Sequence, residues 1–229
     1  MQIRPDVYLL KGKASNFYLC VDEDGLTLID AGMPKEQQLV FDLLDQIGRD
    51  PSQIVRILIT HADIDHVGSL AAIQLATGAQ VYASEKTARY LQAGKSPKHL
   101  PRLLQVFSNA FIKYQPFSED VIETFSDGDK LPVLGGLEAL ATPGHTDDHF
   151  SFFSSSTGVL FAGDAIDTRN GRLNRTRKWL TANEKKANQS AIKLVELAPA
   201  IFACGHGDSL TGHDSGDLMK FFNELREDG

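Results

Sequence analysis

The sequence has few cysteines, no long apolar run and no excess of positive charge, and each absence excludes a class of protein. Two cysteines, Cys20 and Cys204, are too few for a disulfide framework, which favours a reducing compartment. No apolar segment is long enough to cross a bilayer, and the first residues lack the apolar core of a secretory signal. We therefore expect a soluble cytoplasmic protein with no membrane partner.

The balance of charge and the length narrow the class further. The formal net charge of −7 disfavours a nucleic-acid partner, because nucleic-acid binders usually show a basic balance. A chain of 229 residues can bury a sizeable core and suits one large domain. These features are typical of a globular protein that binds a small molecule.

The segment from Thr60 to Gly68 concentrates groups that bind metal ions. It lies between an apolar run at 54–59, which predicts a buried strand, and a helical pattern at 69–76. Imidazole and carboxylate are the usual protein ligands for zinc, iron and manganese. Without a cation, four such groups in six residues would repel each other or stay unsatisfied. The alternative is a polar loop that holds two histidines by chance. The four candidate ligands are His61, Asp63, Asp65 and His66.

Three further candidates follow later strand-like runs. They are His145 in Thr-Pro-Gly-His-Thr, Asp164 in Ala-Gly-Asp-Ala and His206 in Cys-Gly-His-Gly. A glycine directly precedes each one, which lets the backbone turn sharply at a strand end and direct the next side chain into a shared site. This recurrence argues against chance and predicts one metal site built from both halves of the chain.

The order of these motifs resembles the metallo-β-lactamase fold superfamily, whose signature is H-x-H-x-D-H followed by Gly-His, Gly-Asp and a final Gly-His. The resemblance extends from about residue 7 to 225, and Asp30-Ala31-Gly32 is similar to the family's Asp-x-Gly turn. It implies an α/β fold, the αβ/βα four-layer sandwich, in a single domain of residues 1–229. Strands followed by helices, twice over, fit that fold. The chain departs from the signature once, with Asp63 in place of the second histidine.

The resemblance also implies the ligand sets and the chemistry. His61, Asp63 and His145 would hold one divalent ion; Asp65, His66 and His206 would hold a second; and Asp164 would bridge them. Zinc is the expected metal, with iron or manganese as alternatives. A shared metal-bound hydroxide would be the nucleophile. Asp65 is also the candidate catalytic residue, because it could orient that nucleophile or pass on its proton.

Asp63 leaves two outcomes open. It could coordinate the first metal through oxygen, or it could turn away and leave a one-metal site. We expect coordination, because three carboxylates and one hydroxide balance two divalent ions in a partly buried site. A carboxylate at this position makes the first site harder and shifts its preference towards iron or manganese.

Several residues could serve the substrate. His149 resembles a histidine of thioesterase and lactonase members and could contact substrate or a ligand; the alternative is a half-buried structural histidine. Five positive charges at 169–178 make Arg169 and Arg172 candidates for binding an anionic substrate. The alternative there is a solvated loop. His99 and His213 lie outside the motifs and are interpreted as surface or structural residues.

Other segments are predicted to be structural. Residues 95–117 contain prolines around an apolar helical pattern, and the resemblance implies an insertion that forms a substrate lid or a homodimer contact; the alternative is an ordinary packed helix. Helices are also expected at about 34–47, 182–197 and 216–226, and after Ser84 as N-cap through Ala93. Thr181 and Glu184 have the spacing of a capping box.

The leading functional hypothesis is a dinuclear metal-dependent hydrolase acting on an ester, thioester or lactone, similar to the glyoxalase II and lactonase branch. We do not expect the extra helical domain that binds glutathione in glyoxalase II. Alternatives are a phosphodiesterase, suggested by the basic run, and a redox di-iron protein related to flavodiiron proteins, which place a glutamate at the position of Asp63. A non-catalytic binding module is disfavoured because the other ligand positions are filled.

Overall fold

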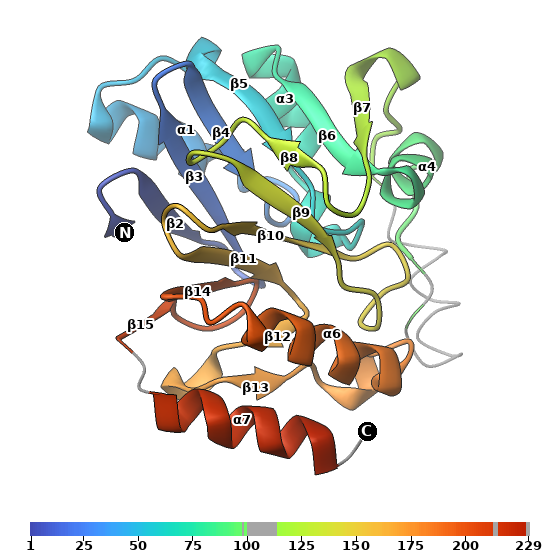
Figure 1. The fold of residues 1–229 in the computed structure, drawn as a ribbon. Helices are drawn as coiled ribbons and strands as arrows, with labels where there is room; N and C mark the ends of the chain where they lie inside the picture. Colours follow the sequence, from blue (N-terminus) through green and yellow to red (C-terminus); the bar gives the residue numbers. More distant parts are fainter. Residues whose placement is uncertain (98, 100–113, 213–214, 228–229) are drawn as a thin grey trace. The chain divides into compact units, whose positions relative to one another are not determined.

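The computed structural model describes residues 1–97, 99, 114–212 and 215–227. The chain divides into two compact units: unit 1 comprises residues 1–96 and 109–125, and unit 2 comprises residues 97–108 and 126–229. Each unit contains a mixed β-sheet with helices packed on it, so the predicted α/β class is confirmed (Figure 1). The single domain and the insertion at about 95–117 stay predictions, since most of that segment lies outside the described residues, as does His213.

Unit 1 is built on a seven-stranded sheet in the order β1 to β7. Neighbours from β1 to β4 are antiparallel, and those from β4 to β7 are parallel. Because parallel strands point the same way, β4, β5 and β6 end at one edge of the sheet. The strands are β1 (Gln2–Arg4), β2 (Val7–Lys11), β3 (Asn16–Asp22), β4 (Gly25–Ile29), β5 (Ile54–Leu58), β6 (Gln80–Ser84) and β7 (Ile122–Phe125).

Three helices cover this sheet: α1 (Gln37–Ile47), α3 (Leu70–Thr77) and α4 (Glu85–Ala93). Their apolar faces, which include Leu44, Ile73 and Leu91, join one buried cluster with the strands. A single turn, α2 (Ile64–Val67), lies within the ligand segment. The described residues of unit 1 also form two short helices, η1 (Pro51–Gln53) and η2 (Glu119–Val121).

Unit 2 contains a six-stranded sheet in the order β15-β14-β11-β10-β9-β8, in which only β11 and β14 pair in parallel. A small hairpin, β12 (Ile166–Asp167) with β13 (Asn174–Arg175), was not expected from the sequence and occupies part of the basic run. The sheet strands are β8 (Lys130–Leu131), β9 (Leu137–Ala141), β10 (Phe150–Ser154), β11 (Val159–Gly163), β14 (Ile201–Cys204) and β15 (Leu210–Thr211).

Two long helices pack against each other in unit 2, α6 (Glu184–Glu196) and α7 (Ser215–Glu227). Leu194 and Leu225 from these helices share a buried cluster with Leu160 and Phe202 of the sheet. Short turns η3 (Arg169–Gly171) and η4 (Lys178–Leu180) precede α6. Within the part of the chain that the structure describes, no helix has the length and apolar character needed to span a membrane.

The predicted helix ends are right in one case and wrong in another. Ser84 caps α4 as expected, because its hydroxyl accepts a hydrogen bond from Thr87 N at 3.1 Å. The capping box of Thr181 is wrong. Asn183 is the N-cap of α6 and its side chain accepts from Lys186 N at 3.0 Å, whereas the Thr181 hydroxyl donates to Arg177 O and closes the preceding turn.

Replacing Asn183 with alanine should therefore lower the free energy of unfolding by about 1 kcal/mol, the usual loss for an N-cap side chain. Thr181→Ala is the matched control and should have a smaller effect, because its hydroxyl bonds to Arg177 O in the preceding turn and satisfies no N–H of α6. Urea denaturation of both variants measures the difference. A loss at Thr181 that equals or exceeds the loss at Asn183 would contradict this assignment of the helix start.

Candidate metal centre

Unit 1 presents four candidate ligands after β5, two on the loop that leaves the strand and two on the short helix α2. His61 and His66 are fully buried and Asp63 is nearly so, while Asp65 is partly exposed. Nε2 of His61 lies 3.5 Å from a carboxylate oxygen of Asp63, and Nε2 of His66 lies 3.9 Å from one of Asp65. Unit 1 therefore brings together all four residues that the sequence predicted.

Asp30, at the end of β4, fixes the orientation of His66. One oxygen of its carboxylate accepts from Thr60 N at 2.9 Å, and the other contacts the Thr60 hydroxyl at 2.7 Å and Nδ1 of His66 at 2.8 Å. Because an ionised carboxylate can only accept hydrogen bonds, the proton of the His66 ring lies on Nδ1. Nε2 then carries the lone pair that a metal ion requires.

Thr60 extends the same argument to His61. The Thr60 hydroxyl donates its single proton to Asp30, so it acts as an acceptor in its 3.0 Å contact with Nδ1 of His61. His61 therefore also carries its proton on Nδ1 and presents Nε2 as the ligand atom. One buried carboxylate thus sets the tautomer of both imidazoles.

A second buried carboxylate, Glu36, supports the loops behind these ligands. It accepts from Lys13 N at 2.6 Å and from Met33 N at 2.8 Å. The loop that contains Lys13 also contains Ser15, whose hydroxyl donates to the carbonyl oxygen of Asp65. Glu36 therefore connects the turn after β4 to the backbone of a ligand, a role that no local sequence pattern had indicated.

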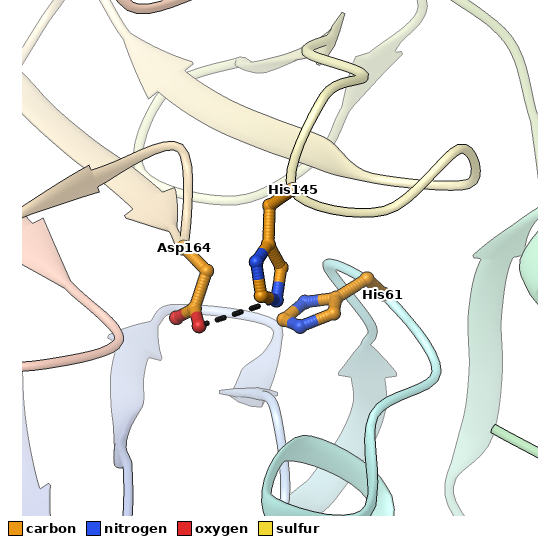
Figure 2. Close-up of side chains that lie close together, drawn as sticks. All are labelled: His61, His145 and Asp164. Atoms are coloured by element: carbon orange, nitrogen blue, oxygen red, sulfur yellow. Dashed lines mark ion pairs between the residues drawn. The ribbon is translucent and has the colours of Figure 1, made fainter. Parts of the chain in front are cut away.

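Unit 2 presents its three candidate ligands after β9, β11 and β14. One oxygen of Asp164 lies 3.5 Å from Nε2 of His145 and 3.1 Å from Nε2 of His206. Figure 2 shows the side chains of His145 and Asp164 turned towards each other with this ion pair dashed, and His61 on its loop after β5. A single carboxylate oxygen that faces two imidazoles is suited to bridging two cations.

The glycines beside these ligands act partly as predicted. Gly144 and Gly163 have positive φ angles of 148° and 53°. A Cβ on Gly144 would lie 2.2 Å from Ala187 N, so only glycine allows α6 to approach this turn. At His206 the chain also bends at the preceding Gly205, but the positive φ, 90°, belongs to Gly207, where a Cβ would lie 2.4 Å from the Thr168 backbone.

His149 is buried behind Asp164 and both of its ring nitrogens are used within unit 2. Nε2 accepts from Asp164 N at 2.9 Å, so the ring proton lies on Nδ1 and is donated to the Thr142 hydroxyl at 2.8 Å. Thr142 in turn contacts the Ser151 hydroxyl at 2.9 Å, and Ser151 donates to Ala162 O. This geometry is that of a neutral histidine that positions a ligand.

Two arginines of the basic run at 169–178 interact with side chains close to them in the sequence. The Arg169 guanidinium pairs with the buried Asp167, and Arg172 Nε donates to Asn174 at 3.2 Å. Arg172 and Arg175 line a cavity of about 620 Å³ between the β12–β13 hairpin and α7. The structure thus places Arg169 in a local ion pair and Arg172 at the rim of this cavity.

The donor atoms fit divalent ions. Two ligand atoms about 2.0–2.2 Å from one tetrahedral ion lie about 3.4 Å apart. The pairs His61–Asp63, His145–Asp164 and His206–Asp164 span 3.5, 3.5 and 3.1 Å, and His66–Asp65 spans 3.9 Å. In His61 and His66 a lone pair, not an N–H, faces the carboxylate, and a cation bound between them would relieve the repulsion.

Comparison with known proteins agrees with this chemistry. A model described as the metallo-beta-lactamase superfamily matches residues 10–206. YobT of Bacillus subtilis is 34% identical over 206 residues, covering 85% of this chain and 84% of that protein. The same organism's probable metallo-hydrolase YflN is 27% identical, covering 86% and 81%. Hydroxyacylglutathione hydrolase GloC of Haemophilus influenzae is 26% identical, covering 83% and 84%.

Solved structures share the fold. A metallo-beta-lactamase family protein of Thermus thermophilus aligns with a TM-score of 0.73 at 22% identity, covering 99% of this chain and 80% of that one. A B3 metallo-beta-lactamase with an active-site glutamic acid also has a TM-score of 0.73, at 23% identity, covering 99% and 86%. The predicted metallo-β-lactamase type of fold is confirmed.

Asp30→Asn tests whether this carboxylate prepares the unit 1 ligands. Asparagine keeps the size and tolerates the φ of 62° found at Asp30, but its single oxygen cannot accept all three hydrogen bonds. Zinc affinity should fall by about 10–100-fold, measured by competition with a chromophoric chelator. Asp45→Asn, an exposed position on α1, is the control. Unchanged affinity in Asp30→Asn would contradict the assigned role.

Proposed function

This chain belongs to the metallo-β-lactamase superfamily and is a metal-dependent hydrolase, and we propose that it hydrolyses a small ester, thioester or lactone at a dinuclear centre. The observation that carries the proposal is the set of strand-end histidines and aspartates, two of whose imidazoles are held in the metal-binding tautomer. Zinc suits this mixed nitrogen and oxygen donor set.

We propose two ligand groups joined by one carboxylate. His61, Asp63 and His145 would hold the first ion, and Asp65, His66 and His206 the second. Asp164 would contact both ions. The distances within each unit support this assignment, because one oxygen of Asp164 already faces His145 and His206, and Asp63 faces Nε2 of His61. We therefore assign Asp63 as an oxygen ligand.

Neither cysteine is suited to act as a nucleophile. Cys20 and Cys204 are completely buried, and burial raises the pKa of both thiols well above the usual value. The nearby carboxylate of Asp167 raises the pKa of Cys204 further. A thiolate is therefore unavailable at neutral pH, which supports attack by water.

Two divalent ions, when bound, would lower the pKa of a water molecule towards neutrality and polarise the carbonyl oxygen of the substrate. The protein's own groups supply position and proton transfer. Asp30 keeps His61 and His66 in one tautomer, and His149 holds the backbone of Asp164. Asp65 is the partly exposed carboxylate of the site, so it is suited to take up a proton from the attacking water.

Hydrolysis of an acyl compound is preferred over the other candidates. Two of the three relatives described above carry hydrolase names, and the name of GloC states an acylglutathione substrate for that protein. These names favour acyl transfer to water over the di-iron redox and phosphodiesterase alternatives. A panel of lactones, thioesters, esters and phosphodiesters, tested with the zinc-loaded protein, identifies the substrate class.

Removal of the metal should abolish this hydrolysis. Dialysis against a chelator, and separately His66→Ala and Asp164→Ala, should each reduce kcat/KM by orders of magnitude, because each removes a ligand or the ions themselves. Zinc should restore the dialysed wild-type protein but not the two variants. Asp45→Ala on the exposed face of α1 serves as the control. Activity that persists through chelation and through both substitutions would show that a protein side chain is the nucleophile.

We further propose that the substrate is anionic and is attracted by the basic run. Arg172 and Arg177 are the informative positions, because both are exposed while Arg169 is paired with a buried carboxylate. The double change to glutamine should raise KM for an anionic substrate at low salt, and the effect should shrink as salt screens the charges. The matched control is the change of Arg49 and Arg89 to glutamine in unit 1. Equal KM values for the double variant and the wild type at low salt would show that residues 169–178 are a solvated loop without a role in substrate binding.

A further inference from the structure

An additional histidine lies beside the ligands of unit 2, outside the family signature. His99 is half-buried, and the centroid of its ring is 5.0 Å from that of His145, with the two planes tilted by 51°. No sequence pattern connects these two residues, and His99 was interpreted above as a surface or structural residue. The structure instead places its ring beside a predicted ligand.

The spacing of the two rings is that of ligands to one ion. Two imidazoles bound to a tetrahedral zinc ion at about 2.0–2.1 Å place their ring centroids about 5 Å apart. His149, a further histidine of unit 2 near His145, does not meet this condition. His149 lies 6.3 Å from His145, nearly perpendicular to it, and its nitrogens are engaged by Asp164 N and Thr142.

The chain also lacks an imidazole that the signature would supply. Asp63 occupies the position of the second histidine, so the first ion has one nitrogen ligand fewer than in the signature H-x-H-x-D-H. A nitrogen donor from another part of the chain would restore the number of nitrogen ligands and keep the site suited to zinc. A carboxylate at residue 63 without such a donor favours harder ions.

We propose that His99 is a further ligand of the metal ion held by His145, and that it compensates for the imidazole missing at residue 63. The proposal rests on the dinuclear centre of the proposed function and adds a residue to it. It predicts that the first site remains a zinc site despite Asp63, and that a change at His99 affects one ion and leaves the ion held by His66 and His206 in place.

Two substitutions in the full-length protein separate a ligand from a packing residue. His99→Phe keeps a ring against His145 but has no nitrogen, and His99→Ala removes both. Zinc dissociation constants come from chelator competition, and the visible absorption of the cobalt-substituted protein reports the donor set. Both variants should bind the first ion at least about tenfold more weakly and should show altered cobalt absorption bands. The affinity of His99→Phe for this ion should be no higher than that of His99→Ala. The second ion should bind as in the wild type.

Control variants distinguish the loss of a metal ligand from a loss of folding or of packing. Lys95→Ala, an exposed change just before this segment, should leave both constants unchanged. Thermal unfolding of the metal-free proteins shows whether a variant folds, and His99→Asn replaces any variant that does not. Wild-type affinity and cobalt spectrum in His99→Phe would overturn the proposal and leave His99 as a packing residue. A wild-type protein that binds no zinc would overturn both this proposal and the proposed function, whereas two bound zinc ions with unaffected His99 variants would overturn this one alone.

Discussion

The hydrogen bonds of Asp30 determine what the histidines of unit 1 can do. Its carboxylate accepts from Thr60 and His66, and through Thr60 it also fixes the proton of His61. A left-handed φ of 62° at a residue other than glycine costs about 1–2 kcal/mol. Three hydrogen bonds to one buried side chain offset that cost. The parallel pairing of β4 with β5 makes the arrangement possible, because it brings the residues after both strands to one edge of the sheet.

Unit 2 uses the same principle with different groups. There the buried partner is His149, which accepts from the backbone N–H of Asp164, and the chain of hydroxyls behind it fixes its tautomer. Gly144 lets α6 pack directly against the turn that carries His145. In both units, therefore, the candidate ligands are held by groups outside the proposed ligand set. Such support keeps the donor atoms in place before an ion binds and lowers the reorganisation that binding requires.

The features that depend on local sequence pattern, the secondary structure and the motif residues, could be predicted from the sequence. Alternating and helical periodicity located the sheets and most of the helices, and the motifs located His61, His145 and their neighbours. Hydrogen-bond directions could not be predicted in the same way. The role of Asp30 depends on the register between β4 and β5, and that of Glu36 on loops that are distant in sequence.

The errors have similar causes. Thr181 and Asn183 can both cap a helix, and the choice depends on where the preceding η4 turn ends. Gly205 precedes a candidate ligand as Gly144 does, yet the positive φ beside His206 belongs to Gly207. The ring of His99 lies 5.0 Å from that of His145, and no motif of the sequence indicated that the two residues are neighbours.

We propose that this chain holds two metal ions through the Nε2 atoms of histidines whose tautomers the protein has fixed. A crystal structure of the zinc-loaded protein, with data collected on both sides of the zinc absorption edge, tests that claim most directly. We predict two anomalous peaks, one bonded to Nε2 of His61 and the other to Nε2 of His66, with Asp164 in contact with both ions. A single peak, or coordination through Nδ1 of either histidine, would contradict it.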